Sequence, residues 1–542
     1  MSIDFTDEQI KAISYPGNVV LTACPGSGKT AVIVERIIND ISLCNDYHGV
    51  IAISYTNKAS EELRKRCCKL LPDIKSSFFG TMDKFYLNEI VYPYIKHFWG
   101  KCENLVLMKF KDLNEDWQEY LNEYTQDSNI CDNITTYSFE KIHQLYNKGF
   151  IILEFIPLIS FFILNKSKSC NRYLLSKYTS VFVDEYQDTG LVQHKIFIHL
   201  SRIGIRATAV GDVDQSIYSY AGRSPEYLLE LKNKENSFKP FEITVNHRSH
   251  PSIVNYANRL INKDCELLSY DVVYVRKINI KGSQKEISAW IDSQISIIKN
   301  EFKITKESDI AILLATNNSV SLIASLLKTS SRAYLDDDLS KIGGEISNLI
   351  KDLLMLKYSK KMTVQSIIDG SRNKILSNDR IKELRKILSC VKKADENELI
   401  PAIRISVREL IGDEINSNHI DAIHTIINSS MMLNNYLPMV DNELQIMTLH
   451  KSKGLEFDYV FHLDLYDWIL PRREYIKGCY DEVFTNYSQC LNLHYVGITR
   501  AKKCVALVNS TLRYNFQNEI KQAKPSQFLS REGLNGLFSN LI

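Results

Sequence analysis

Short apolar runs rich in β-branched residues recur along the chain, and each is followed by a polar turn and then a helical pattern. This alternation is typical of a parallel sheet with helices on its faces. The runs fall into one group per half of the chain, which predicts two sheets. They are residues 19–22, 50–54, 181–183 and 207–210 in the first half, and residues 309–314, 445–449, 459–463 and 504–508 in the second.

Two long segments interrupt the alternation. Residues 88–171 are rich in aromatic, Asn, Lys and Glu residues, and residues 359–439 have a helical periodicity with almost no glycine. Both are predicted to be largely helical insertions. The expected fold class is therefore α/β, with one lobe formed by residues 1–87 and 172–245 and the other by residues 246–358 and 440–542.

The length and composition limit the possible functions. A chain of 542 residues is too long for one hydrophobic core and should form several domains. The net charge is only +2, so any nucleic acid must be bound in a local groove. None of the 12 cysteines forms a C-x-x-C pair, which argues against a zinc site or an iron–sulfur cluster and for free thiols in a reducing cytoplasm.

One apolar stretch, residues 150–164, raises the question of a membrane. It is shorter than the roughly 20 residues that a membrane span needs, and it contains Glu154 and Pro157. A buried helix in the first insertion is the better interpretation. The first seven residues carry no Lys or Arg and precede no apolar run, so no signal peptide is expected and a cytoplasmic location is predicted.

A glycine-rich loop follows the first apolar run and precedes a helical pattern, which is the context that a P-loop requires. Gly26 and Gly28 let the backbone N–H groups face phosphates, and the helix N-terminus adds a positive dipole end. Lys29 is expected to reach the β- and γ-phosphates, and Thr30 to bind Mg²⁺. A chance glycine-rich turn is the alternative, and this context makes it a poor one. The nucleotide-contacting loop is Ala23, Cys24, Pro25, Gly26, Ser27, Gly28, Lys29 and Thr30.

Two adjacent acids follow the apolar run at residues 181–183. Open α/β sheets bind ligands at the carboxyl ends of their strands. Asp184 is therefore expected to hold Mg²⁺, directly or through water, and Glu185 to polarise the attacking water. An acidic pair by itself is more often a solvated turn, but a buried strand before it and a P-loop upstream favour catalysis.

Further short motifs accompany the phosphate site in a fixed order. They are residues 5–9 (FTDEQ), 54–59 (SYTNKA), 80–81 (GT), 184–189 (DEYQDT), 211–220 (GDVDQSIYSY), 246–249 (NHRS), 448–457 (TLHKSKGLEF) and 495–501 (YVGITRA). Together they resemble the motifs of superfamily 1A DNA helicases of the UvrD/Rep type. The resemblance implies two RecA-like lobes with two inserted subdomains, the second one reduced. It also implies ATP and Mg²⁺ as cofactors, and single-stranded DNA, or a duplex with a single-stranded tail, as the substrate.

The resemblance assigns roles to single residues. For the nucleotide, it places Gln9 at the adenine edge, Glu456 at the ribose, Gln215 in coupling of the γ-phosphate to DNA, and Arg248 and Arg500 of the second lobe as arginine fingers. For DNA, it indicates Tyr55, Thr56, Asn57, Thr81, Tyr220, Thr448 and His450. An exposed tyrosine can stack on a base of any sequence, although Tyr220 taken alone would more often be a packed loop residue.

Several positions depart from the family pattern. His247 and Ala31 stand where the family usually sandwiches the adenine between an aromatic residue and an arginine. Ala221 replaces an arginine of the third motif, and Met82-Asp83 replaces Phe-His after Thr81. These differences concern base stacking, coupling and DNA grip more than the hydrolytic centre.

Two functions remain open from the sequence. The first is a translocase or helicase that moves on single-stranded DNA, with 3′ to 5′ polarity implied by the resemblance. The second is a DNA-gated ATPase switch that unwinds little. The compact chain resembles the helicase-like subunit of the Gabija anti-phage system, which implies an OLD-family (Toprim) nuclease as a partner. A P-loop kinase or GTPase would leave the later motifs without a purpose.

Overall fold

The protein is described from a computed structural model that covers residues 4–102, 105–125, 139–218, 222–233, 237–359, 362–370, 378–476, 482–515, 517 and 519–541. The chain divides into two compact units, Met1–Arg248 and Ser249–Ile542. This boundary lies close to residue 246, where the second lobe was expected to begin. It leaves Arg248, expected in the second lobe, as the last residue of the first unit.

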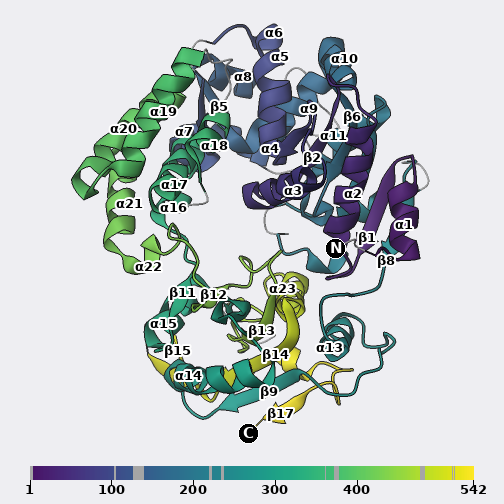
Figure 1. Ribbon diagram of the computed structural model, residues 1–542, viewed down its shortest axis with the longest axis vertical. Helices are drawn as coiled ribbons and strands as arrows, with labels where there is room; N and C mark the ends of the chain where they lie inside the picture. The colour runs from purple at the N-terminus through teal and green to yellow at the C-terminus, as the bar shows by residue number, and fades with distance from the viewer. Residues whose placement is uncertain are drawn as a thin grey trace. The chain divides into compact units, whose positions relative to one another are not determined.

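The first unit is built on a parallel sheet. Within the described residues the strand order is β3-β2-β6-β7-β1-β8, and every neighbouring pair is parallel. The strands are β1 (Val19–Ala23), β2 (Gly49–Ile53), β3 (Phe78–Gly80), β6 (Tyr178–Val183), β7 (Arg206–Gly211) and β8 (Lys239–Ile243). The helices around them are α1 (Asp7–Ser14), α2 (Lys29–Ser42), α3 (Asn57–Leu70), α4 (Met82–Phe85), α11 (Leu191–Arg202) and α12 (Glu226–Glu230) (Figure 1).

Both faces of this sheet are buried, as expected for a parallel sheet. Successive residues of a strand point to opposite faces. On β1, Val20 packs into the cluster that contains Ile159 and Phe197, whereas Leu21 packs into the cluster that contains Val32 and Ile37 of α2. All five residues of β1 and of β2 are buried, which explains why these strands are continuous apolar runs in the sequence.

The first insertion is largely helical, as predicted. Its elements are a π-helix (Tyr86–Val91), α5 (Tyr92–Tyr94), α6 (Lys96–Trp99), α7 (Glu115–Leu121), α8 (Glu140–Asn147), α9 (Ile156–Lys166), α10 (Lys168–Lys177) and the paired parallel strands β4 (Val106–Met108) and β5 (Phe150–Ile152). The apolar stretch at 150–164 forms a 3-10 helical turn at Leu153–Phe155 and the buried helix α9 from Ile156 onward. The prediction of a helix was wrong for residues 150–152, because they pair with β4 instead.

The second unit repeats the architecture. Its described strands follow the order β11-β12-β10-β13-β14-β9-β17, again with parallel pairs throughout. They are β9 (Val275–Ile280), β10 (Ile310–Leu314), β11 (Ser331–Ala333), β12 (Leu444–Thr448), β13 (Phe457–His462), β14 (Ala501–Ser510) and β17 (Ser539–Leu541). The accompanying elements are α13 (Pro251–Ile261), α14 (Gln284–Glu301), α15 (Asn317–Leu326), α23 (Tyr487–Thr499) and the antiparallel pair β15 (Leu512–Tyr514) and β16 (Ile520–Gln522).

The second insertion forms a helical cluster with its own hydrophobic core. Leu339, Leu349 and Leu353 belong to this core, so the cluster begins before residue 359, where the insertion was expected to start. Its helices are α16 (Asp338–Ile342), α17 (Gly344–Tyr358), α18 (Val364–Gly370), α19 (Asn378–Lys393), α20 (Glu396–Ile411), α21 (Ser417–Asn428) and α22 (Ser430–Leu433).

A buried arginine ties this helical cluster to the sheet of the second unit. Arg332 on β11 is only 4% exposed, and its Nε donates to Glu443 Oε2 over 2.9 Å. Its other nitrogens donate to the backbone carbonyls of Asn434, Leu437 and Pro438, on the segment that returns from α22 to β12. The return segment is thereby fixed against the strand that precedes the cluster.

No helix within the described ranges is long and apolar enough to cross a membrane. The ten cysteines that the structure describes are free thiols.

Candidate nucleotide and nucleic-acid site

The strand order of the first sheet determines which loops meet at its carboxyl edge. β6, β7 and β1 are neighbours, and they end at Val183, Gly211 and Ala23. The P-loop, the Asp212 loop and the Asp184–Glu185 turn therefore lie side by side. β2 and β3 continue the same edge, so Tyr55 and Thr81 follow the next two strand ends. One edge thus carries both the phosphate-site residues and part of the expected DNA track.

The expected P-loop turns at two glycines in the left-handed region. Gly26 and Gly28 have positive φ values of 73° and 83°, and Gly28 is the N-cap of α2. A side chain at either glycine would be strained. Ser27 is fully buried and donates from Oγ to the carbonyl of Cys24 over 2.7 Å, which closes the turn. Burial raises the pKa of the Cys24 thiol to about 11, so this cysteine is a neutral part of the loop.

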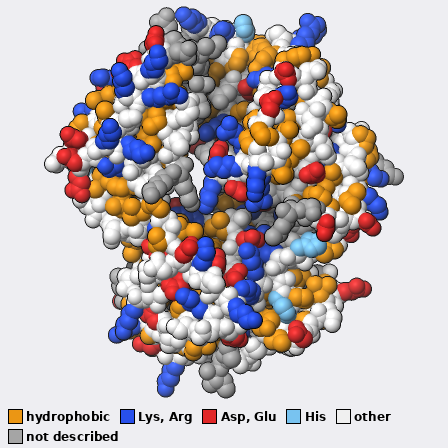
Figure 2. Space-filling model, viewed as in Figure 1, with side chains coloured by type: hydrophobic (Ala, Val, Ile, Leu, Met, Phe, Trp, Pro, Cys, Tyr) orange, Lys and Arg blue, Asp and Glu red, His pale blue; other side chains and the backbone are white. Residues whose placement is uncertain are grey.

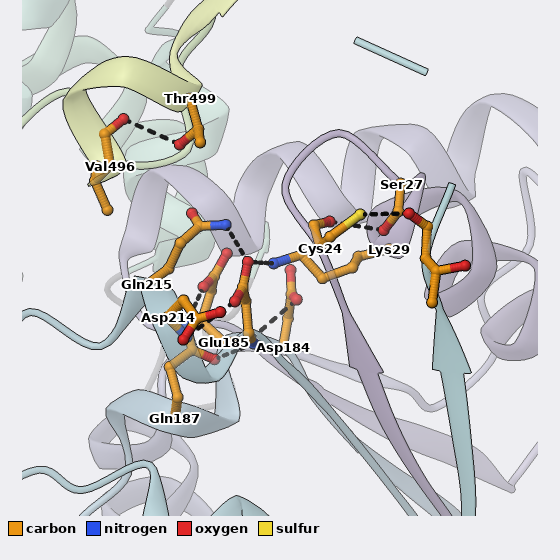
Figure 3. Close-up of polar contacts among 12 residues, drawn as sticks. Cys24, Ser27, Lys29, Asp184, Glu185, Gln187, Asp214, Gln215, Val496 and Thr499 are labelled. Atoms are coloured by element: carbon orange, nitrogen blue, oxygen red, sulfur yellow. Dashed lines mark hydrogen bonds and ion pairs between the residues drawn. The ribbon is translucent and has the colours of Figure 1, made fainter. Parts of the chain in front are cut away.

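Lys29 has a buried acidic partner. Its Nζ lies 3.8 Å from Asp212 Oδ2, and the two side chains are 11% and 5% exposed. The amide of Gln215 donates to the same oxygen over 2.5 Å. Burial raises the pKa of Asp212, and the Lys29 charge opposes that shift. Lys29 and Gln215 thus reach Asp212 from the P-loop and from the segment after β7, and Figure 3 shows their two side chains pointing toward one another.

The two acids after β6 are held by local hydrogen bonds. Asp184 Oδ1 accepts from the backbone N–H of Glu185 over 3.0 Å. Glu185 has a left-handed backbone conformation, with φ 55° and ψ 43°. Its carboxylate accepts from Gln187 Nε2 over 2.5 Å, and Gln187 Oε1 accepts from the N–H of Asp212 (Figure 3). Gln187 therefore links the acid turn to the loop that holds Lys29.

Three other residues of the expected nucleotide site, all within Met1–Arg248, also lie at the P-loop. Gln9 is 4% exposed, and its Nε2 donates to the Ser27 carbonyl over 2.8 Å. The N–H of His247 donates to the Gly26 carbonyl over 2.9 Å, while the His247 side chain is exposed. The Cβ of Arg248 lies directly against Gly26. Three residues distant in sequence thus contact the loop.

The aromatic residue of the expected DNA track has a partner. Tyr55 is 39% exposed and stacks on Tyr218, with ring centroids 4.8 Å apart and an interplanar angle of 25°. Thr56 is exposed and caps α3, whose first residue is Asn57. Thr81 caps α4 in the same way. Tyr220, the other expected stacking residue, lies outside the described residues.

The second unit holds the remaining expected residues. Thr448 ends β12 and is 7% exposed, and its Oγ1 accepts from the backbone N–H of Lys451, which curls the loop that carries His450. Burial lowers the pKa of His450. Glu456 is exposed and pairs with Lys502 over 3.2 Å. Thr448 and His450 follow the carboxyl end of β12, whereas Glu456 directly precedes β13 and therefore lies at the opposite, amino edge of the second sheet.

Arg500 is held firmly within the second unit. It is 2% exposed, and its Nε donates to the Val496 carbonyl over 3.1 Å. Its Nη1 donates to the Leu455 carbonyl over 3.1 Å. The backbone contacts fix the guanidinium at the junction of α23 and β14, next to the segment that follows Gly454.

Basic side chains do not form one uniform surface. On the face drawn in Figure 2 they alternate with acidic and hydrophobic ones, and several lie over α19 and α20. Lys382, Arg385 and Lys386 of α19 are exposed. This distribution agrees with a net charge of +2.

Comparison with known proteins assigns both units. The UvrD/REP helicase N-terminal domain matches residues 5–102 and 100–236, and the UvrD-like helicase C-terminal domain matches residues 344–511. Together these matches cover well over half of the chain. The chain belongs to the UvrD/Rep helicase family. Membership confirms the predicted fold class and the predicted enzyme class, an ATP hydrolase.

Individual relatives align with this chain over almost their whole length. Gabija protein GajB of Bacillus cereus (strain VD045) is 27% identical over 94% of this chain and 96% of its own length. ATP-dependent DNA helicase Rep of Buchnera aphidicola subsp. Baizongia pistaciae is 26% identical over 97% of this chain and 94% of its own length. Rep of Escherichia coli (strain K12) is 24% identical over 96% and 93%.

The structure adds three residues to the UvrD/Rep-type site that the sequence interpretation missed. Asp212 was detectable, because Gly211-Asp212 follows an apolar run just as Asp184 follows its own. Tyr218 and Gln187 were not, because their roles depend on partners at Tyr55, Glu185 and Asp212 that only the fold brings close.

Proposed function

We propose that this protein is a DNA-stimulated ATPase motor that moves on single-stranded DNA in the 3′ to 5′ direction. One observation carries the proposal. The carboxyl edge of one parallel sheet bears the P-loop after β1, the acid pair after β6 and, after the neighbouring strand β2, the exposed Tyr55, which stacks on the partly buried Tyr218. The proposed nucleotide site and a surface suited to stacking on bases therefore lie on the same edge of one sheet, so a change at one can be transmitted to the other.

The phosphate site supplies the residues that hydrolysis needs. We assign Lys29 to the β- and γ-phosphates and Glu185 to the attacking water. Thr30, at the start of α2, and Asp184, at the end of β6, fit Mg²⁺, because this ion prefers oxygen ligands and usually binds one or two carboxylates together with substrate phosphates. The bound ion would neutralise charge on the phosphates. Asp212 gives Lys29 a counter-charge, with which the phosphates of a bound triphosphate would compete.

A second function deserves a direct test, because one relative favours it. The alignment with GajB spans 531 positions, close to the 542 residues of this chain, whereas the alignment with Rep of Buchnera spans 654 and therefore requires extra segments in Rep. In size the chain thus matches GajB better. The alternative is a DNA-gated switch whose ATP hydrolysis reports DNA to a partner nuclease of the OLD (Toprim) type in anti-phage defence.

A strand-displacement assay beside a DNA-stimulated ATPase assay separates the two functions. The substrate is a duplex with a 3′ single-stranded tail, and a 5′-tailed duplex of the same sequence is the polarity control. The motor predicts displacement from the 3′-tailed substrate that depends on ATP. Strong stimulation of hydrolysis without displacement from either substrate would favour the switch. Absence of stimulation by any single strand would contradict both.

A further inference from the structure

The turn that carries Glu185 needs support from its surroundings. Glu185 is in the left-handed region, with φ 55°, where a residue other than glycine is unfavourable unless neighbouring structure holds it. The bonds from Gln187 to the Glu185 carboxylate and from the Asp188 N–H to its carbonyl lie within the turn itself. They shape the turn, and Gln187 Oε1 also joins it to the Asp212 loop, but none of these bonds attaches it to helix α11.

The attachment comes from the next residue, Tyr186. Tyr186 is fully buried, and its hydroxyl lies 2.9 Å from Nδ1 of His194 on α11, which is 2% exposed. On the far side of the ring, His194 Nε2 lies 3.4 Å from Glu230 Oε2 at the end of α12. A polar chain therefore runs from the acid turn through the interior to a surface carboxylate.

The chemistry of Tyr186, His194 and Glu230 determines which group donates and which accepts in each contact. Burial lowers the pKa of His194, although Glu230 opposes the shift, so the ring is neutral near neutral pH. The Glu230 carboxylate favours the tautomer with its proton on Nε2, which leaves a lone pair on Nδ1. The Tyr186 hydroxyl then donates to His194. Aromatic contacts also hold both rings in place. His194 stacks on Tyr227 with ring centroids 5.2 Å apart, and Tyr186 packs edge-on against Phe197 with centroids 4.9 Å apart.

We propose that His194 is a positioning residue for ATP hydrolysis, which anchors Tyr186 and thereby holds the Glu185 carboxylate in its working position. The inference rests on the proposed role of Glu185. His194 contacts Tyr186 and Glu230, and its effect on Glu185 passes through Tyr186. Its contribution is to fix the distance between α11 and the turn, so that the strained backbone at residue 185 has one stable arrangement.

Steady-state ATP hydrolysis by the full chain with a saturating single strand tests the proposal. His194→Phe keeps a ring that can stack on Tyr227 but removes both nitrogens. We expect kcat to fall about tenfold or more and the KM for ATP to stay within about twofold, because the turn shifts while the P-loop does not. His194→Asn can accept from Tyr186 with its amide oxygen and should recover most of the lost kcat.

A double-mutant cycle shows whether the loss passes through Tyr186. Tyr186→Phe should lower kcat as His194→Phe does, and the double variant should be no worse than either single variant. His199→Phe is the matched control, since His199 lies on the same helix and bonds Asn171 instead, and it should leave kcat unchanged.

Each outcome decides one point. Wild-type kcat in His194→Phe overturns the proposal, and so do additive losses in the double variant. If His194→Phe fails to fold, His194→Asn and Tyr186→Phe still test the link. Glu185→Gln separates the two levels. Normal hydrolysis by Glu185→Gln removes the proposed role of that acid, whereas an inactive Glu185→Gln beside a fully active His194→Phe refutes only the anchoring.

Discussion

Replacing Tyr218 with alanine tests how the first unit holds DNA. The ring of Tyr218 lies 4.8 Å from that of Tyr55, too close to admit a base between them. A base that enters must first separate the two rings, which costs about 0.5–1.5 kcal/mol. It then stacks on both rings, and the contact with Tyr218 contributes about 1–3 kcal/mol. Because Tyr55 can stack on the base with or without Tyr218, the net contribution of Tyr218 is its stacking minus the separation cost, roughly 0.5–1.5 kcal/mol or about two- to twelvefold in affinity.

The expected result is a loss of this size in the affinity of Tyr218→Ala for single-stranded DNA. Fluorescence anisotropy with a labelled oligothymidine measures it, and a parallel titration with a fluorescent ATP analogue should show unchanged nucleotide binding. Tyr47→Ala is a close control. Tyr47 is also an exposed ring that packs on a neighbour, His48, but it precedes β2, at the opposite end of the strand from Tyr55.

Equal DNA affinity in Tyr218→Ala and in the wild type would refute this account of the track. The Tyr55–Tyr218 pair would then be a packing contact only. A loss of ATP binding in the same variant would instead show that the aromatic pair supports the Gln215 segment.

Three further predictions follow from the second unit. Arg500→Ala should lower the ATPase kcat far more than ATP affinity, because fingers of this kind contribute roughly 10³–10⁵ in rate. Arg500→Lys should not restore it, and similar losses in kcat and affinity would argue against a finger. Arg332→Met should destabilise the second unit by about 3–5 kcal/mol, since it leaves Glu443 without its buried partner. Urea unfolding measures this loss, and an unchanged midpoint would contradict the stabilising role of Arg332. Burial lowers the pKa of His462 to about 4. The unfolded chain therefore binds a proton near pH 6.5, whereas the folded chain does not bind it until about pH 4. The free energy of unfolding should consequently fall as the pH drops from about 6.5 to 4. His462→Gln should flatten that decline in pH-dependent urea titrations, and a variant as acid-sensitive as the wild type would refute the assignment.

The central strands were predictable because burial on both faces makes them continuous apolar runs. All eight predicted runs correspond to observed strands, from β1 to β14. The strands that the pattern missed lie mostly toward the edges of the two sheets. β8 contains Pro240 and has exposed residues, β3 and β11 are only three residues long, and β9 has Arg276 and Lys277 in its middle. One-sided burial and short length leave too little apolar signal for recognition.

The local form of the candidate phosphate site was predictable for a different reason. Gly26, Gly28 and Lys29 act through the local backbone of one loop, so their spacing alone carries the information. The acid turn was also local. What the sequence could not supply were contacts between segments far apart in the chain, such as Lys29 with Asp212, because these depend on β7 lying between β1 and β6.

The central claim is that ATP is hydrolysed at the edge of the first sheet under the control of single-stranded DNA. The most direct measurement is ATP turnover by the wild type, Glu185→Gln and Lys29→Ala, each with and without an oligothymidine, alongside ATP binding. The account predicts strong stimulation in the wild type only, ATP binding without turnover in Glu185→Gln, and neither binding nor turnover in Lys29→Ala. Stimulated turnover in Glu185→Gln at the wild-type rate would contradict it.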